Sequence, residues 1–208
     1  YLNFTSAATF TVNVASGATT PSIRKGAGMT GNVNIIAGAV SITVTAVETN
    51  GTPVQNARVF VQTNTGSGTL PYQDSISITR SGTTATATHT AHGLANGDKV
   101  VIRGADQNAY VSIHTISNVT TNTYDFTVSG SPTTPATGTI ISSFVFISGT
   151  TDINGEITSP ARTLGTNQSI SGNVRKASTS PYYKTGQVVG TINTANGLNS
   201  TVVMLRDE

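Results

Sequence analysis

Three histidines, His89, His92 and His114, are the residues of this chain best suited to metal binding or proton transfer. His89 and His92 are three residues apart, in a stretch whose pattern predicts a strand end followed by a turn. Residues at that spacing do not share one face of a strand, and a metal site also needs a third ligand, which no residue close in sequence supplies. We therefore expect no bound metal, and histidines in structural or exposed positions.

Other catalytic patterns are weak. The chain has no cysteine and no Gly-x-Ser-x-Gly segment that would present a nucleophilic serine. Asp152 to Gly155 has the form of a calcium-loop start, but Glu156 comes too early to be the last ligand, so a plain turn is expected. A carboxylate pair of the glycosidase kind stays open. Its candidates are Asp74, Asp98, Asp106, Asp125, Asp152 and Glu156. We expect no enzyme activity, no catalytic residue and no cofactor.

The charge of the chain excludes some partners. Charged residues make up only 10% of the sequence, and the formal net charge is +2. Basic residues occur singly or as isolated pairs such as Arg24-Lys25 and Arg175-Lys176. Nucleic-acid binding needs clustered basic residues with interleaved aromatics, so we expect no nucleic-acid partner. No apolar run is long enough to span a bilayer, so we expect no membrane partner.

The elements that would position these residues are strands. Apolar and polar residues alternate with a period of two, and no segment shows helical periodicity. Asn-Gly pairs, which supply the positive φ angles of tight hairpins, punctuate the alternating segments. The pattern predicts an all-β fold. Its expected strands are 9–14, 40–47, 57–63, 99–104, 123–130, 142–149 and 200–207.

Tyr182 and Tyr183 are adjacent in "SPYYKTG". Neighbouring residues of a strand face opposite sides, so one ring is expected to pack inward and the other to face outward. The outward ring is a candidate contact with a partner subunit or a sugar. The alternative is one core ring and one surface ring that has no partner.

Residues 1–39 are rich in Gly, Thr and Ala and contain few large apolar side chains. We expect an extended N-terminal arm, or the end of a preceding β-domain, that neighbouring copies order; a flexible linker is the alternative. The strand "TFTVNV", which contains Val12, is predicted to pair with the edge strand near "TPVQNARVFV" of another copy. This pairing leads us to expect a homo-oligomer, with a trimer favoured.

Two short segments, "TNGTPVQNARVFV" and "TTDINGEI", carry a first resemblance. The residues that fit its patterns G-x-P-V-x-x-A-x-V and T-D-x-x-G are Gly51, Pro53, Val54, Ala57 and Val59, then Thr151, Asp152 and Gly155. They resemble transthyretin-like and bacterial Ig-like domains, which are β-sandwiches in which the two segments lie close in sequence. Here about ninety residues separate Val61 from Thr151. The resemblance implies an Ig-like sandwich formed by 40–73 and 144–208, interrupted by an inserted domain at 74–143.

The insert carries a second resemblance. Thr86 to Gly104 follows the pattern T-x-T-x-x-x-H-G-L-x-N-G-D-x-V-x-I-x-G. It resembles a small β-barrel module inserted in many bacteriophage virion proteins, which is also similar to the first catalytic-cysteine half-domain of ubiquitin-activating enzymes. Without cysteine, no ubiquitin chemistry follows from this likeness. The pattern also predicts that the Asp98 carboxylate accepts amide hydrogens of the turn before it.

The stretch from Ser171 to the C-terminus resembles the ends of bacteriophage structural proteins of this build. Together the resemblances imply a non-enzymatic structural component of a tailed-bacteriophage particle. It would be a capsid decoration, collar or fibre protein on the virion surface, and its partners would be copies of itself and other virion proteins. The alternative is a receptor- or glycan-binding module of a tail fibre or bacterial adhesin, which would bind a host surface glycan. A glycan-degrading spike is a further alternative.

Overall fold

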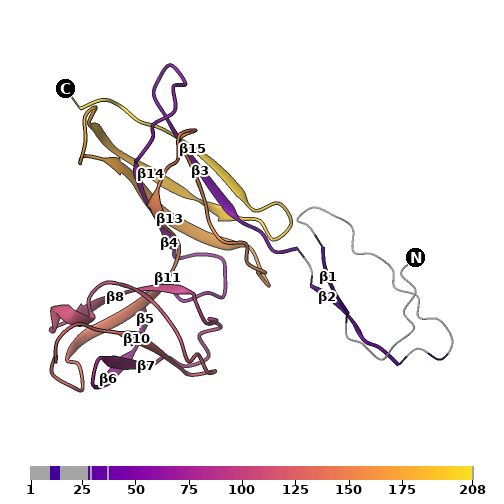
Figure 1. The fold of residues 1–208 in the computed structure, drawn as a ribbon, viewed down its shortest axis with the longest axis vertical. Coiled ribbons are helices and arrows are strands. Elements are labelled where there is room, and N and C mark those ends of the chain that lie inside the picture. The colour runs from indigo at the N-terminus through magenta and orange to yellow at the C-terminus, as the bar shows by residue number, and fades with distance from the viewer. Residues whose placement is uncertain (1–9, 15–27, 29, 37, 208) are drawn as a thin grey trace.

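The computed structural model describes residues 10–14, 28, 30–36 and 38–207. Within them the chain is all-β, as predicted, with one turn of 3-10 helix, η1 (Asn108–Tyr110) (Figure 1). The strands are β1 (Phe10–Asn13), β2 (Val33–Ile36), β3 (Ile42–Val47), β4 (Arg58–Thr63), β5 (Asp74–Ser75), β6 (Ser77–Ser81), β7 (Thr84–Thr88), β8 (Lys99–Ala105), β9 (Ile113–Thr115), β10 (Thr123–Thr127), β11 (Gly138–Thr150), β12 (Glu156–Thr158), β13 (Gln168–Lys176), β14 (Tyr183–Ile192) and β15 (Leu198–Val203). The described residues contain no helix that is both long and apolar enough to cross a membrane.

Two sheets pack face to face in the upper part of Figure 1. One has the order β12-β3-β15, and the other is the β14-β13-β4-β11 part of a seven-stranded sheet. Along β3 the side chains of Ile42, Val44 and Ala46 are fully buried, and the residues between them are half-exposed. The sheets are in close contact, because a Cβ on Gly186 of β14 would lie 2.4 Å from Val202 Cγ1 of β15. Alternation with one buried face explains why these residues form strands.

The two segments that carry the first resemblance lie side by side. The Ala57 N–H donates to the Thr151 hydroxyl at 2.9 Å, and that hydroxyl donates to the Val54 carbonyl at 2.7 Å. Gly155 has a φ of +72°, and a Cβ there would lie 2.4 Å from the Ala46 carbonyl oxygen. Buried Thr151 therefore ties the end of β11 to the start of β4 across a long stretch of sequence.

Residues 74–143 form one sheet of their own and extend another. β6, β7 and β10 form a three-stranded sheet, while β5, β8 and β9 extend the seven-stranded sheet. Tyr124 and Phe126 are buried in the core of this part. In the described residues no barrel closes through hydrogen bonds. β9 ends the seven-stranded sheet and has only three residues, and the link from there to β10 is a single isolated bridge between Ser117 and Asp125. The predicted barrel is therefore two separate sheets around one core.

Strand β11 joins the two parts of the chain (Figure 1). Its first half pairs antiparallel with β8, with Ser142 opposite Ile102, and its second half pairs antiparallel with β4, with Gly149 opposite Val59. One sheet thus runs through both parts. The predicted domain boundary between 143 and 144 falls inside this strand.

The strand that contains Val12 pairs within the chain, where β1 runs parallel to β2 with Val12 opposite Ile35. Its predicted partner does not offer an edge, because β4 has β13 on one side and β11 on the other. The prediction that β4 is an edge strand was wrong. Period-two alternation marks a buried face, but it does not tell a central strand from an edge strand. Val12 is half-buried, and its role as a partner contact stays a prediction.

Candidate functional site

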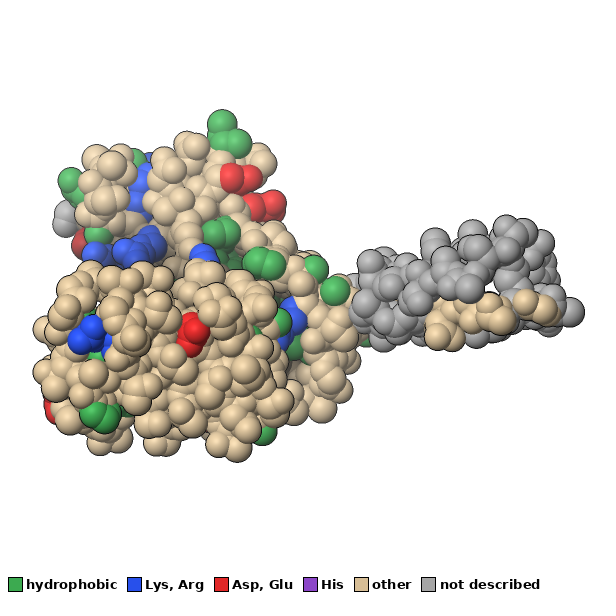
Figure 2. All heavy atoms as spheres, turned by 60° about the horizontal axis from the view of Figure 1, so that its bottom comes forward, with side chains coloured by type: hydrophobic (Ala, Val, Ile, Leu, Met, Phe, Trp, Pro, Cys, Tyr) green, Lys and Arg blue, Asp and Glu red, His purple; other side chains and the backbone are tan. Residues whose placement is uncertain are grey.

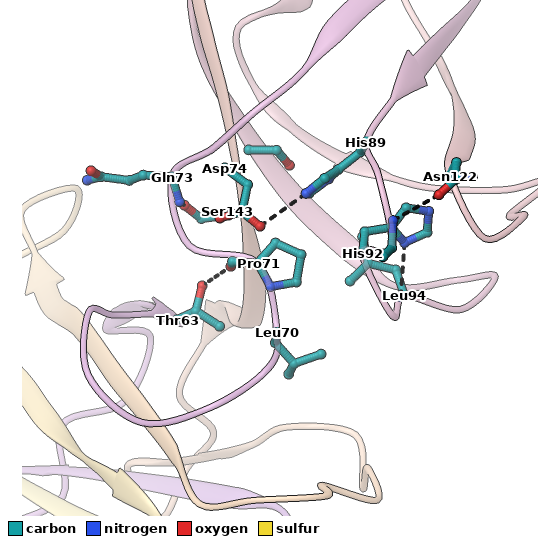
Figure 3. Close-up of polar contacts among 12 residues, drawn as sticks. Thr63, Leu70, Pro71, Gln73, Asp74, His89, His92, Leu94, Asn122 and Ser143 are labelled. Carbon is teal, nitrogen blue, oxygen red and sulfur yellow. Dashed lines mark hydrogen bonds and ion pairs between the residues drawn. The ribbon is translucent and has the colours of Figure 1, made fainter.

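His89 and His92 lie together inside the part formed by residues 74–143 (Figure 3). His89 directly follows β7, and Ala91, whose φ is +51°, turns the chain so that the second ring lies beside the first. The ring centroids are 5.4 Å apart, and each side chain is 3% exposed. Both rings contact the Tyr124 ring, at centroid distances of 6.0 and 5.3 Å. Strand spacing alone predicted that the histidines would not share a face; the left-handed turn at Ala91 brings them together.

Hydrogen bonds define the neutral form of each ring. His89 Nε2 lies 3.2 Å from Asp74 Oδ2, so this nitrogen carries the proton and donates it (Figure 3). His92 Nδ1 accepts the Leu94 N–H at 3.0 Å, so its own proton is on Nε2. The other two nitrogens, His89 Nδ1 and His92 Nε2, are buried and have no hydrogen-bond partner in the described part of the chain. When both rings are neutral, the pair therefore holds one acceptor and one donor without partners among the described residues.

This arrangement resembles neither a metal centre nor a hydrolytic triad. Among the described residues, no three His, Asp or Glu side chains are grouped closely enough to hold a metal ion. The Ser143 hydroxyl accepts a backbone N–H at 2.9 Å, and the Ser142 hydroxyl accepts the Tyr124 hydroxyl at 3.0 Å. His89 Nδ1 has no such hydroxyl, so the Asp74–His89 pair has no nucleophile to activate within the described residues. We interpret the pair as part of the packing of this core.

The buried rings give the stability of the protein a pH dependence of definite sign. Burial lowers the pKa of His92 below its usual 6.5, and the adjacent His89 lowers it further. Burial also lowers the pKa of His114, whose Nε2 is 3.0 Å from the Tyr110 carbonyl oxygen. Below pH 6.5 the unfolded chain takes up protons that the folded rings do not. The contribution of His92 and His114 to the free energy of unfolding is therefore at its largest above pH 6.5, and it is lost as the pH falls below that value.

We expect an NMR titration of the ring resonances to give midpoints below 6.5 for His92 and His114. Urea should unfold the protein at a lower concentration at about pH 5.5 than at about pH 7.5. In His92→Gln, the difference between the two pH values should shrink. A midpoint for His92 at or above the ordinary histidine value would contradict this reading.

A second cluster holds the two parts of the chain together. Arg162 follows β12, and its Nη1 lies 2.7 and 2.6 Å from the two carboxylate oxygens of Asp98. Its Nη2 donates to the Gly93 carbonyl at 2.9 Å, and its guanidinium carbon lies 4.8 Å from the centre of the Phe144 ring. The Asp98 carboxylate also accepts the Ala95 N–H at 2.8 Å, which confirms its predicted role in the turn. Sequence reasoning missed Arg162, because 64 residues separate it from Asp98.

A cleft of about 410 Å³ lies beside this ion pair. Its walls come from residues 96–99, from 144–148 of β11, and from 157, 158 and 160–162. Phe144 and Phe146 meet edge to face there, with ring centroids 4.7 Å apart. Because Arg162 and Asp98 satisfy each other, the cleft offers mainly apolar walls. Such walls suit the apolar face of a sugar or side chain better than an ion.

The adjacent tyrosines face opposite sides, as predicted. Tyr183 is buried and Tyr182 is 50% exposed. The Tyr183 hydroxyl donates to Glu48 Oε1 at 2.5 Å, and Arg206 Nη2 donates to the same oxygen at 2.8 Å. The hydrogen bond from Tyr183, and then that from Arg206, lowers the pKa of Glu48, while burial raises the pKa of Tyr183. Of the two candidates, only Tyr182 faces outward, and its contact with a partner stays a prediction.

Tyr183→Phe should lower the melting temperature by a few degrees at neutral pH, because Glu48 loses a hydrogen bond that favours its ionised form. The folded pKa of Glu48 is below 4.5, so this contribution is present above pH 4.5 and is lost as the pH falls through the folded pKa. Calorimetry at neutral and acidic pH would measure both effects. Tyr182→Phe is the matched control and should leave the melting temperature unchanged; equal losses in the two variants would refute the assignment.

Comparisons with known proteins give a weak likeness to a phage enzyme. No protein-family model matches the sequence, and no curated protein matches it. Among solved structures, 61% of the chain can be laid over 21% of the protein "Phage phi92 endosialidase", with 16% sequence identity and a TM-score of 0.27. The chain thus spans about a fifth of the length of that protein. A likeness this low carries no argument about function.

Proposed function

We propose that the chain is a non-enzymatic structural component of a bacteriophage particle, where it makes subunit contacts and displays its β-domains on the virion surface. It would act as a capsid decoration, collar or fibre protein. The sequence resemblances of residues 40–73, 74–143 and 144–208 support this proposal. So does the all-β fold, which suits a rigid and repeated part.

The observation that carries the proposal is that several of the few ionisable groups form pairs within the chain. Asp98 and Arg162 bind each other across the junction, and Glu48 binds both Tyr183 and Arg206 near the C-terminal end. The buried histidine pair fills a core. In each case the ionisable groups are engaged with the chain itself. The face in Figure 2 is mainly uncharged polar side chains and backbone, with few charged side chains. Such a surface is suited to contact with other subunits.

A glycan-binding module is the second candidate, and the junction cleft favours it. Phe144 and Phe146 line the cleft, and an apolar wall of this kind can receive the apolar face of a sugar ring. Exposed Tyr182 offers a further aromatic surface. On this reading the protein would bind a host surface glycan from the tip of a fibre or adhesin.

Mass spectrometry of purified particles, followed by an electron cryo-microscopy map, tests the first proposal. We expect the chain in many copies on the particle surface, bound to other virion proteins. Its absence from purified particles would overturn the proposal. A glycan array probed with the full chain tests the second candidate, and reproducible cleavage of a host glycan would contradict the non-enzymatic role in both.

A further inference from the structure

In the part of the chain that the structure describes, strand β14 ends the seven-stranded sheet and has a long unpaired edge. At its start, the Lys184 N–H donates to the Leu205 carbonyl at 2.8 Å, and the Asp207 N–H donates to the Tyr182 carbonyl at 3.0 Å. Residues 205–207 therefore cover the first part of the edge. From 186 to 192 the strand pairs with β13 on one side, and the described residues supply no hydrogen-bonded strand on the other.

This edge lacks the features that usually protect an open strand. Natural edges are kept short or carry charged residues, proline or bulges, because unpaired backbone groups invite another chain to pair with them. β9, which ends the other side of the same sheet, has only three residues. β14 has ten residues, and from 186 to 192 it contains no charged residue and no proline. Val189 on its outward face is 70% exposed.

The sequence of this edge suits pairing with a second copy of itself. The segment "TGQVVGT", residues 185–191, reads nearly the same in both directions. Opposite residues of an antiparallel pair must share one hydrogen-bonding type, so a two-fold axis passes through a residue and not between two residues. An axis at Val188 places Thr185 opposite Thr191 of the second copy, and Gln187 opposite Val189. A charged residue at a two-fold axis would face the same charge on the second copy, which is unfavourable. This segment has no charged residue, so no such repulsion arises.

The inward residues of the segment have a separate explanation. A Cβ on Gly186 would meet Val202, and a Cβ on Gly190 would lie 3.1 Å from Leu198 Cδ2, so both glycines make room for β15. The outward residues Thr185, Gln187, Val189 and Thr191 are exposed. Their lack of charge leaves this edge free of like-charge repulsion when two copies pair.

We propose that β14 is the contact between two copies of this chain, which pair antiparallel through residues 185–191 about a two-fold axis at Val188. The contact joins two seven-stranded sheets into one continuous sheet, and main-chain hydrogen bonds fasten it. The inference rests on the proposed function, because it names the surface through which copies meet. A single edge contact is weak, and display of many copies on a symmetric particle strengthens it by raising the effective concentration. It predicts a dimer in place of the trimer expected from the sequence.

Sedimentation velocity of the full chain over a range of concentrations tests the proposal. The wild type should show a monomer–dimer equilibrium. The double variant Gln187→Lys, Val189→Lys places lysines opposite one another across the axis and should weaken dimerisation about tenfold or more. The double variant Gln187→Glu, Val189→Lys places opposite charges face to face in the same register and should dimerise at least as well as the wild type.

The control variant Asn199→Lys, Thr201→Lys adds the same charge at two exposed positions of β15 and should leave the dimer intact. All four positions are exposed, so folding, checked by circular dichroism, should be preserved. A wild type that stays monomeric at the highest concentration would overturn the proposal. A trimer, or a dimer that the Gln187 and Val189 changes leave untouched, would do the same. None of these results bears on whether the chain is found in purified particles, so failure here is distinguishable from failure of the proposed function.

Discussion

Gly172→Ala should destabilise the protein by about 3 kcal/mol or more. Gly172 lies in β13, opposite Val61 of β4 and Val188 of β14. A Cβ at this position would lie 2.0 Å from the Phe60 carbonyl oxygen and 2.8 Å from Val61 Cα. Both are backbone atoms of a strand that is hydrogen bonded on two sides, so they cannot move away without breaking the ladder to β11.

Gly165→Ala is the matched control, because a Cβ there would have no atom within 4 Å and the residue is exposed. Alanine at such a site reduces the freedom of the unfolded chain and should be neutral or slightly stabilising. Urea unfolding of both variants would measure the difference. Similar free energies of unfolding for the two variants would show that β13 and β4 are not packed as closely as described.

Arg162→Ala should have the second largest effect, a loss of about 2 kcal/mol. The change removes the partner of Asp98, whose side chain is only 15% exposed, together with the hydrogen bond to Gly93 and the contact with the Phe144 ring. An ionised carboxylate left half-buried without a partner costs more than an exposed one. Because these contacts join the two parts of the chain, limited proteolysis should also cut the variant sooner between residues 74 and 143.

A double-mutant cycle separates the ion pair from the rest of this effect. Asp98→Asn keeps an oxygen for the Ala95 N–H but loses the charge, so the double variant Asp98→Asn, Arg162→Ala should be less destabilised than the sum of the single changes. Arg206→Ala is the control, since Arg206 is 59% exposed and Glu48, although 15% exposed like Asp98, keeps its hydrogen bond from Tyr183, so this change should cost little. Additive losses at Asp98 and Arg162 would mean that the two charges do not stabilise each other.

Much of the local structure could be predicted because it depends on neighbours in sequence. Alternation predicted β3 and β4, and the inward and outward rings of Tyr183 and Tyr182 followed from the same rule. The Asp98 turn could be predicted because its carboxylate binds an amide only three residues away. The hydrogen bond between Ala57 and Thr151, which are 94 residues apart, came from the structure alone.

Three features could not be predicted, for different physical reasons: the histidine pair, the pairing of Arg162 with Asp98, and the central position of β4. The histidines meet because one residue, Ala91, adopts a left-handed conformation that alternation does not reveal. Arg162 finds Asp98 only after β11 has brought the two parts of the chain together.

The sequence by itself determined that this protein is all-β, with few charges, and where seven of the fifteen described strands and several turns lie, because each of these properties depends on composition or on residues a few positions apart. Only the tertiary structure decided which strands are central and which are open edges. A central strand and an edge strand can carry the same alternation, and they differ only in whether another strand occupies the far side of the hydrogen-bonding ladder. β4 and β14 show the difference: β4 has a partner on both sides, whereas no strand of the described residues pairs with the outer side of β14 from 186 to 192.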